Sequence, residues 1–276
     1  DHAVIRDIRT FDPEFIGVSV RNIDTVDSFS SADTWYIESI KTLIDAIKAV
    51  SSRPVILGGP AFSIMPEQIL DYSGADYGIV GEGETQFCQL IDDLKKGRKT
   101  GKILRPSPVP VDLEKALLPK YDPKLASYYI DQCGMLNYQT KRGCPHGCNY
   151  CSYPLIEGRT IRYQDPEHVV ENLIRLNQTF GVDTVFFTDA VFNDGADRYL
   201  EIAEWMIRKE CRMRWAAYFR PRRMSGRDMR LLKQSGLYAI ELGSDGACDT
   251  VLRGMGKTFD FDTVLDMNRV CVREEV

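Results

Sequence analysis

Short apolar runs alternate with amphipathic helical segments along both halves of this 276-residue chain, and this alternation restricts its fold more than any other feature. In the first half, strands are predicted at residues 15–20, 54–57 and 77–80, and helices at residues 36–47 and 66–72. Strands that end in glycine and feed helices pair in parallel in a doubly wound sheet, where ligands bind beyond the carboxyl ends of the strands. Residues 1–97 are therefore predicted to form one α/β domain.

The second half repeats the alternation and predicts a (β/α) repeat, as in a barrel or part of one. Its predicted strands lie at residues 138–142, 184–188, 213–219 and 238–242. Asp165-Pro166-Glu167 supplies an N-cap and a helical first turn, and Ser225 with Asp228 marks another helix start. A further helix is predicted at about residues 196–209. This domain is predicted to span residues 135–276.

Residues 98–134 are predicted to be a linker, stiffened by Pro106, Pro108, Pro110 and Pro119.

Three of the eight cysteines, Cys144, Cys148 and Cys151, lie close together with the spacing C-x3-C-x2-C. Three thiolates on one tight loop can bind three irons of a cubane cluster and leave the fourth iron open as a reaction site. A structural zinc site or an electron-carrying cluster requires a fourth ligand. His146 is awkwardly placed for that role, and the chain has no second C-x2-C pair. The loop therefore predicts an iron–sulfur cluster with one open iron.

Two further features of the loop bear on cofactor binding. Gly143 and Gly147 give its backbone the freedom to wrap a cluster closely. Tyr150 is placed where its ring can pack beside a bound cofactor, or alternatively in a protein core.

This loop, after a predicted strand and before (β/α) repeats, resembles that of the radical S-adenosylmethionine (radical SAM) superfamily. In that family the open iron chelates S-adenosylmethionine, and reduction of the cluster gives a 5′-deoxyadenosyl radical. The resemblance implies that Cys144, Cys148 and Cys151 hold a [4Fe-4S] cluster. It further implies S-adenosylmethionine contacts for Tyr150, Asp189, Arg220, Glu241 and Ser244. Asp189 would hold the amino group and Arg220 the carboxylate, although both residues also fit ordinary solvent-facing strand ends. Asp245 and Gly246 stand where the family usually has a Glu-Ser pair, which puts the ribose contacts in doubt.

Three strand-end motifs of the first domain resemble the cobalamin-binding domain that precedes many such barrels. The implied cobalamin contacts are Ser19, Arg21, Asn22, Gly58, Gly59, Gly81, Glu82 and Gly83. Taken singly, each group of glycines also fits an ordinary turn. Residues 1–3 do not match the loop that supplies an axial histidine in other cobalamin proteins, so the axial ligand is not predicted. By comparison with the family, the first domain is expected to be incomplete at its N-terminus and the barrel at its C-terminus.

These features together predict a cobalamin-binding radical SAM enzyme that methylates an unactivated carbon. The alternatives are a similar enzyme that performs cyclisation, rearrangement or redox chemistry, and an iron–sulfur electron carrier or binding module. A methylthiotransferase is disfavoured, because residues 1–96 contain only Cys88 where cluster cysteines would be needed. The resemblance implies a small-molecule or peptide substrate and an external electron donor of the flavodoxin or ferredoxin type.

The composition limits partners and location. A net charge of −5 and a pI near 5.4 provide no bulk attraction for nucleic acid or anionic lipid. The sequence has no apolar run of membrane-spanning length and no signal pattern at its start. A cytoplasmic location without membrane association is therefore expected.

Overall fold

The computed structural model describes residues 2–25, 35–107, 110–114 and 120–276. The chain forms two compact units. The first contains residues 1–111 together with Leu155–Glu157, and the second contains Asp112–Pro154 and Gly158–Val276. Pro108 and Pro119, two of the prolines predicted to stiffen a linker, lie outside the described residues.

The first unit contains a four-stranded parallel sheet whose strands follow one another in chain order. The strands are β1 (Ile16–Ser19), β2 (Val55–Gly58), β3 (Tyr77–Ile79) and β4 (Ile103–Leu104). In β2, Val55, Ile56 and Leu57 are all buried, as expected of a strand covered on both faces. β4 lies within the segment predicted to be a linker and pairs with β3, so that segment contributes to the sheet.

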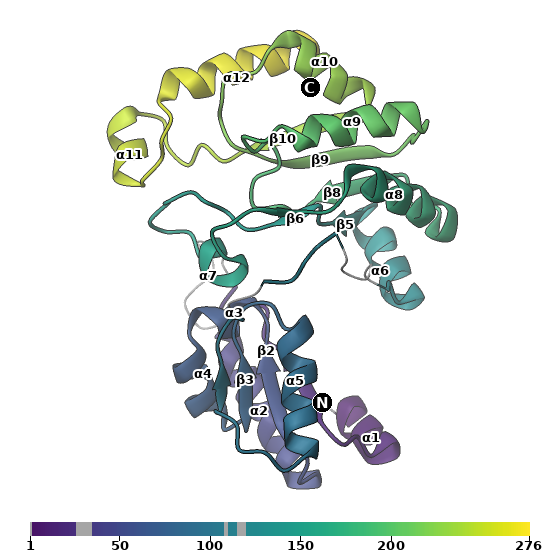
Figure 1. The fold of residues 1–276 in the computed structure, drawn as a ribbon, viewed down its shortest axis with the longest axis vertical. Helices are drawn as coiled ribbons and strands as arrows, with labels where there is room; N and C mark the ends of the chain where they lie inside the picture. Colours follow the sequence, from purple (N-terminus) through teal and green to yellow (C-terminus); the bar gives the residue numbers. More distant parts are fainter. Residues whose placement is uncertain (1, 26–34, 108–109, 115–119) are drawn as a thin grey trace. The chain divides into compact units, whose positions relative to one another are not determined.

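Helices cover both faces of this sheet, which confirms the predicted doubly wound α/β class (Figure 1). They are α1 (His2–Phe11), α2 (Tyr36–Val50), α3 (Pro60–Ile64), α4 (Pro66–Ser73) and α5 (Glu84–Lys95). Ile44 of α2 and Ile69 of α4 pack with Leu57 in one core cluster. Leu90 of α5 packs with Ile56 in a second cluster. Since neighbouring residues of a strand point to opposite faces, the two clusters lie on opposite sides of the sheet.

The second unit contains another four-stranded parallel sheet, in the order β10-β9-β8-β5. The strands are β5 (Leu136–Tyr138), β8 (Thr184–Phe187), β9 (Arg214–Phe219) and β10 (Leu237–Leu242). The prediction of one strand over residues 138–142 was wrong. β5 ends at Tyr138, and Lys141–Arg142 form a separate short strand, β6, which pairs antiparallel with β7 (Arg162–Tyr163).

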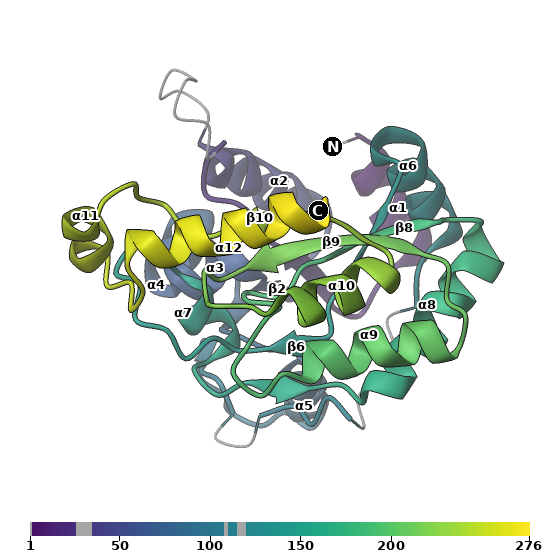
Figure 2. The ribbon, with the colours of Figure 1, turned by 90° about the horizontal axis from the view of Figure 1, so that it is seen from above.

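The helices of the second unit follow the predicted (β/α) alternation. They are α6 (Pro123–Cys133), α8 (Pro166–Phe180), α9 (Arg198–Arg208), α10 (Gly226–Gln234), α11 (Asp249–Gly254) and α12 (Phe261–Glu274). The short helix α7 (Tyr153–Glu157) lies between β6 and β7 in the chain, and its residues Leu155–Glu157 belong to the first unit. Helices α8, α9, α10 and α12 succeed one another along the sheet, each in contact with the next (Figure 2). The two predicted helix starts are confirmed, because Asp165 accepts a hydrogen bond from the backbone nitrogen of His168 at 3.0 Å and Ser225 accepts one from that of Asp228 at 3.1 Å.

An aromatic core fixes the loop that follows β8. Phe192 in this loop is fully buried and stacks on Phe187 of β8, with ring centroids 4.7 Å apart. It also contacts Trp215 of β9, with centroids 5.1 Å apart. Because large buried side chains are held in single rotamers by close packing, this contact gives the loop a defined position at the carboxyl end of the sheet.

None of the helices in the described part of the chain has both the length and the apolar character needed to cross a bilayer.

Candidate active site

The three cysteines predicted to hold a cluster lie on one connection that begins directly after β6. Cys144 is buried, and Cys148 and Cys151 are half-buried. Burial raises the pKa of the Cys144 thiol, and the neighbouring Cys151 and Cys148 raise it further. Among the described residues, no group of three or more His, Cys, Asp or Glu side chains is placed to hold a single metal ion. The three thiols lie near enough to one another for Cys151 and Cys148 to act on Cys144 electrostatically.

Gly143 sets the start of this loop through its backbone conformation. Its φ angle is +98°, and a Cβ atom added there would lie 2.2 Å from the carbonyl oxygen of Thr160. Next to it, the backbone nitrogen of Cys144 donates a hydrogen bond to the oxygen of Gly158 at 3.0 Å. Only glycine combines a positive φ with so close a backbone approach. The first cysteine is therefore held against the segment that leads into β7.

The second half of the loop rests on the turn after α11. The backbone nitrogen of Asn149 donates to the oxygen of Met255 at 3.1 Å, and its side-chain amide donates to Gly254 at 2.8 Å. Gly256, with φ +75°, allows this approach, because a Cβ there would lie 2.6 Å from the oxygen of Gly147. More than a hundred residues of chain separate the loop from its support, and sequence analysis did not detect this contact.

Two basic side chains, Arg220 and Lys257, face the cysteines. Burial lowers the pKa of Arg220, and the thiols of Cys148 and Cys144 oppose that change. Burial also lowers the pKa of His146, and the two cations lower it further, so the surroundings favour the neutral imidazole. A loop that carries thiolates is stabilised by such neighbouring positive charge. Lys257 was not identified as a site residue from the sequence.

Tyr150 lies on the outer side of the loop and not in a core, since its side chain is 54% exposed. Its hydroxyl donates to a carboxylate oxygen of Asp245 at 2.6 Å. Lys257 forms an ion pair with the same carboxylate, and its ammonium lies 5.3 Å from the Tyr150 ring centroid. The ring therefore has an open face and a fixed hydroxyl, so it is available to a bound cofactor.

Asp189 is completely buried, which excludes the solvent-facing alternative for this residue. Its carboxylate accepts hydrogen bonds from the backbone nitrogen of Thr140 at 2.7 Å, the Thr140 hydroxyl at 2.5 Å and the backbone nitrogen of Lys141 at 3.1 Å. Burial raises the pKa of Asp189 to about 6, against the lowering effects of Lys141 and these bonds. Both carboxylate oxygens already accept hydrogen bonds from Thr140 and Lys141. This geometry favours a role in positioning the residues before the cysteine loop over direct contact with a ligand.

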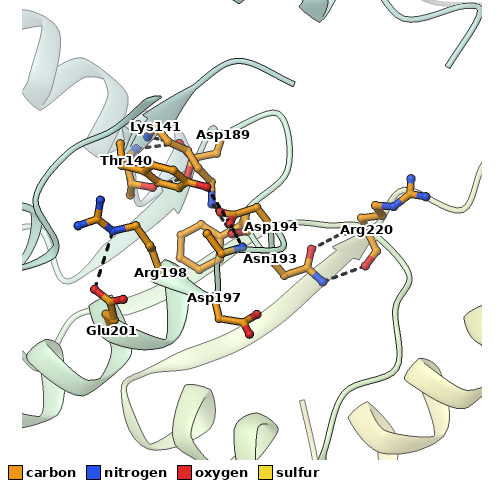
Figure 3. A network of polar contacts seen from close by, with 12 residues as sticks. Thr140, Lys141, Asp189, Asn193, Asp194, Asp197, Arg198, Glu201 and Arg220 are labelled. Carbon is orange, nitrogen blue, oxygen red and sulfur yellow. Dashed lines mark hydrogen bonds and ion pairs between the residues drawn. The ribbon is translucent and has the colours of Figure 1, made fainter. Parts of the chain in front are cut away.

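A second buried carboxylate, Asp194, fixes the same segment (Figure 3). It forms an ion pair with Lys141, whose ammonium also donates to the oxygen of Phe192 at 2.5 Å. The hydroxyl of Tyr163 in β7 donates to Asp194 at 3.0 Å. Burial raises the pKa of Tyr163, and the charge of Asp194 raises it further. The loop after β8 is thereby tied to both strands of the β6–β7 pair.

Arg220 follows β9 and is half-buried, so it is not an ordinary solvent-facing strand end either. Asn193 holds its backbone from both sides: its side-chain oxygen accepts from the Arg220 nitrogen at 2.8 Å, and its amide donates to the Arg220 oxygen at 2.9 Å (Figure 3). The guanidinium bonds the Thr258 hydroxyl and lies 4.7 Å from the Phe259 ring centroid. The sequence analysis missed Asn193, whose function depends on this contact across two strand ends.

Glu241 and Ser244 lie at and just beyond the end of β10. Glu241 is exposed and lies beside Tyr218 of β9 in register, on the face opposite the apolar core. Tyr218 in turn contacts Phe186 of β8, with centroids 4.9 Å apart. Ser244 is half-buried, and its backbone nitrogen donates to Leu242 at 2.8 Å. Glu241 therefore lies next to Tyr218, on a face that the alternation of side chains along the strand could have identified.

In the first unit, the predicted motifs meet at the carboxyl edge of the sheet. Ser19 lies beside Gly58 in the β1–β2 register. Gly59 has φ +97°, and a Cβ there would lie 2.7 Å from the oxygen of Val20. Ser63, which sequence analysis missed, bridges the strand ends, because its hydroxyl donates to the Gly59 oxygen at 2.9 Å and accepts from the Gly81 nitrogen at 2.9 Å. The edge therefore presents bare backbone suited to the close approach of a bulky ligand.

The remaining predicted residues of this edge follow the same strands. Arg21 and Asn22 come directly after β1 and are exposed. Glu82 and Gly83 follow β3 and are half-buried, and Glu82 accepts a hydrogen bond from the backbone nitrogen of Val111 at 3.4 Å. All eight predicted residues thus lie at strand ends along one edge of the first sheet.

Comparison with known proteins gives two family matches. Residues 1–91 match the model of the B12 binding domain, and residues 138–274 match that of the radical SAM superfamily. An uncharacterized methyltransferase of Pyrococcus horikoshii is 25% identical over 91% of this chain and 55% of its own length. A tryptophan 2-C-methyltransferase of Streptomyces laurentii is 23% identical over 95% of this chain and 56% of its own length.

A solved structure has a similar fold. It is the radical S-adenosylmethionine methyltransferase TsrM of Kitasatospora setae, with tryptophan and an S-adenosylmethionine analogue bound. The TM-score is 0.84 at 23% identity, over 99% of this chain and 57% of the other. This chain therefore spans a little over half the length of these relatives.

Proposed function

Because this chain belongs to the radical SAM superfamily and carries a B12 binding domain ahead of the radical SAM domain, we propose that it methylates an unactivated carbon in a cobalamin-dependent reaction. The family matches confirm the predicted cofactor set of a [4Fe-4S] cluster, S-adenosylmethionine and cobalamin. The methyltransferases among the relatives support the choice of methyl transfer over other radical chemistry.

The observation that carries the proposal is the loop of Cys144, Cys148 and Cys151, with Arg220 and Lys257 beside its thiols. When bound, the cofactors would supply a radical able to remove hydrogen from an unreactive carbon and a methyl group to replace it. Three thiolates hold a cluster while leaving one iron without a protein ligand. In this assignment the loop holds the cluster and the two cations offset its negative charge.

We assign the surrounding residues to S-adenosylmethionine and its positioning. Arg220 presents a guanidinium fork suited to the methionyl carboxylate, and Asn193 fixes its backbone. Tyr150, Glu241 and Ser244 lie around the same edge as further contacts. Asp189 holds the backbone before the cysteine loop, and in this way sets the position of the cluster relative to the sheet.

We assign the edge of the first sheet to cobalamin. Ser19, Gly58, Gly59 and Gly81 provide close backbone approach and a hydroxyl, and Arg21, Asn22, Glu82 and Gly83 flank them. The test of this part is the absorbance spectrum of protein purified from cells grown with cobalamin. A corrinoid band that stays with the protein on gel filtration supports the assignment, and its absence contradicts it.

The activity is tested by anaerobic reconstitution, reduction and supply of S-adenosylmethionine. We expect 5′-deoxyadenosine to form and the cluster's electron paramagnetic resonance signal to change when S-adenosylmethionine binds. The variant Cys148→Ala should lose both, whereas Cys133→Ala, which removes an exposed cysteine outside the loop, should retain them. A cluster signal that ignores S-adenosylmethionine would point to an electron carrier. Mass analysis of the product for an added methyl group separates methylation from cyclisation, rearrangement or redox change.

The proposal includes a small-molecule or peptide substrate, an external electron donor of flavodoxin or ferredoxin type and a cytoplasmic location. The donor is required because the cluster must be reduced in each cycle. A reducing compartment fits a chain whose eight cysteines are all free thiols.

A further inference from the structure

A cavity of about 630 Å³ lies at the carboxyl end of the sheet in the second unit. Its wall is formed by the segment after β9, by α11 and by the segment that leads into α12. This volume is in the range of sites that bind small molecules. Arg220 and Lys257, the two cations that face the cysteines, both belong to the wall. A molecule held in the cavity would therefore lie next to the candidate active site.

The cavity has an excess of positive charge. Five basic side chains line it, Arg220, Arg222, Arg223, Arg253 and Lys257, against two acids, Asp249 and Asp260. Both acids already serve the backbone: Asp249 accepts from the nitrogen of Phe261 at 2.9 Å, and Asp260 caps α12 by accepting from that of Thr263 at 2.9 Å. Asp249 also lies 3.9 Å from Arg253, and hydrogen bonds from Thr263, together with the charge of Arg223, lower the pKa of Asp260. Two acids do not balance five cations, so the wall keeps an excess of positive charge, which favours an anion.

Three of the five cations are held by other groups. Arg222 donates a hydrogen bond to the backbone carbonyl oxygen of Asp194 at 2.9 Å and forms an ion pair with the carboxylate of Asp197 at 3.0 Å. Lys257 pairs with Asp245 and donates to the oxygen of Gly243 at 3.0 Å. Arg220 bonds Thr258 and is assigned above to the methionyl carboxylate.

Arg223 and Arg253 are the cations left for a ligand. Arg223 is exposed and makes no hydrogen bond or ion pair within the described ranges 2–25, 35–107, 110–114 and 120–276. Arg253 reaches Asp249 only at 3.9 Å, with its side chain 71% exposed. Two arginines with open donors that line the same cavity suit a carboxylate or phosphate group, because such a group accepts several charge-assisted hydrogen bonds.

We propose that this cavity binds an anionic group of the substrate, a carboxylate or a phosphate ester, through Arg223 and Arg253. The inference rests on the proposed function, because it assigns the second reactant of that reaction a charged anchor beside the cysteine loop. Such an anchor positions the rest of the substrate, so that binding energy from a non-reacting group orients the reacting carbon.

The experiment uses the reconstituted protein with saturating S-adenosylmethionine and inorganic phosphate as the probe. Binding is followed by the shift in melting temperature on titration with phosphate, against chloride at equal ionic strength. Arg223→Gln and Arg253→Gln should each weaken the apparent affinity for phosphate by about tenfold, the loss expected for one charge-assisted contact. Arg269→Gln is the matched control, because Arg269 is exposed on α12, pairs with Asp266 at 2.8 Å and does not line the cavity. Acetate should compete with phosphate in the wild-type protein.

The outcomes separate the sources of the anion. Phosphate that binds alongside S-adenosylmethionine supports a second anion site, whereas phosphate displaced by S-adenosylmethionine places the cofactor's own carboxylate there and overturns the proposal. Equal affinities in Arg223→Gln, Arg253→Gln and the wild type also overturn it. Formation of 5′-deoxyadenosine is measured in parallel, so that a failure of the proposed radical function is seen separately from a failure of the anion site.

Discussion

Lys141 and Asp194 form an ion pair in which the two side chains are only 4% and 3% exposed. Lys141 lies three residues before the first cysteine of the loop, and Asp194 lies in the connection after β8. The pair therefore connects the start of the cysteine loop to the carboxyl end of the sheet. Asp189, which accepts hydrogen bonds from the neighbouring backbone, strengthens the same connection.

Removal of one member of this pair should destabilise the second unit strongly. Lys141→Met leaves the Asp194 carboxylate buried without its cation, which costs about 3 to 5 kcal/mol. The control Arg269→Met breaks an exposed pair, 72% and 46% exposed, and should cost less than about 1 kcal/mol. Urea unfolding followed by tryptophan fluorescence measures both, since Trp205 and Trp215 report on this unit. Equal losses in the two variants would contradict a structural role for the buried pair.

The sequence predicts the strands whose side chains form the apolar core, but it does not predict the hydrogen bonds that connect one strand end to another. The apolar runs of β8, β9 and β10 are visible by composition, and in β9 three consecutive residues, Trp215, Ala216 and Ala217, are buried. The end of β5 is not visible in this way. It depends on Asp189, which lies 49 residues after Thr140 and takes the backbone hydrogen bonds there.

In the candidate site, too, local sequence patterns could be recognised, whereas contacts between residues far apart in the chain could not. The three cysteines and the strand-end glycines are local patterns, so their positions could be assigned before the structure was known. Lys257 and Gly256 lie more than a hundred residues after the loop they support, and no local pattern marks them. Asp189 was identified as a candidate cofactor contact, but its carboxylate accepts hydrogen bonds from the protein itself, namely from the backbone of Thr140 and Lys141 and from the Thr140 hydroxyl.

Asp189 should make stability depend on pH. Its pKa is raised from 3.8 to about 6, so between these values the folded chain binds more protons than the unfolded chain. Stability from this group is present below pH 3.8 and is lost as the pH rises through about 6, by about 3 kcal/mol in total. Asp189→Asn retains the hydrogen-bonding shape without the charge. The unfolding free energy of the variant relative to the wild type should therefore rise from pH 4 to pH 7 by roughly 2.4 kcal/mol, which is most of the total. A difference that does not vary with pH would contradict the raised pKa.

Cobalamin retention should depend on the backbone at Gly59. Gly59→Ala places a Cβ 2.7 Å from the oxygen of Val20 at a φ of +97°, which shifts the strand end that we assign to the cofactor. We expect the variant to lose most of its bound corrinoid, measured by absorbance after gel filtration. Gly101→Ala serves as the control in the same unit, because its nearest neighbour would be 3.7 Å from the added Cβ. If both variants retain corrinoid equally, the strand-end assignment is wrong.

Substitution of the two glycines of the cysteine loop should have different effects on cluster assembly. Gly143→Ala forces a Cβ to within 2.2 Å of the Thr160 oxygen at a φ of +98°, so the backbone beside Cys144 must move. Backbone strain of this kind costs about 1 to 3 kcal/mol, before the clash is counted. Gly147→Ala meets no atom within 4 Å and provides a control in the same loop. We expect Gly143→Ala to bind much less iron per chain after reconstitution and Gly147→Ala to bind nearly as much as the wild type. If Gly147→Ala instead binds less iron than Gly143→Ala, the position of Cys144 before the cluster binds does not determine assembly. The loop would then have to reorganise around the cluster.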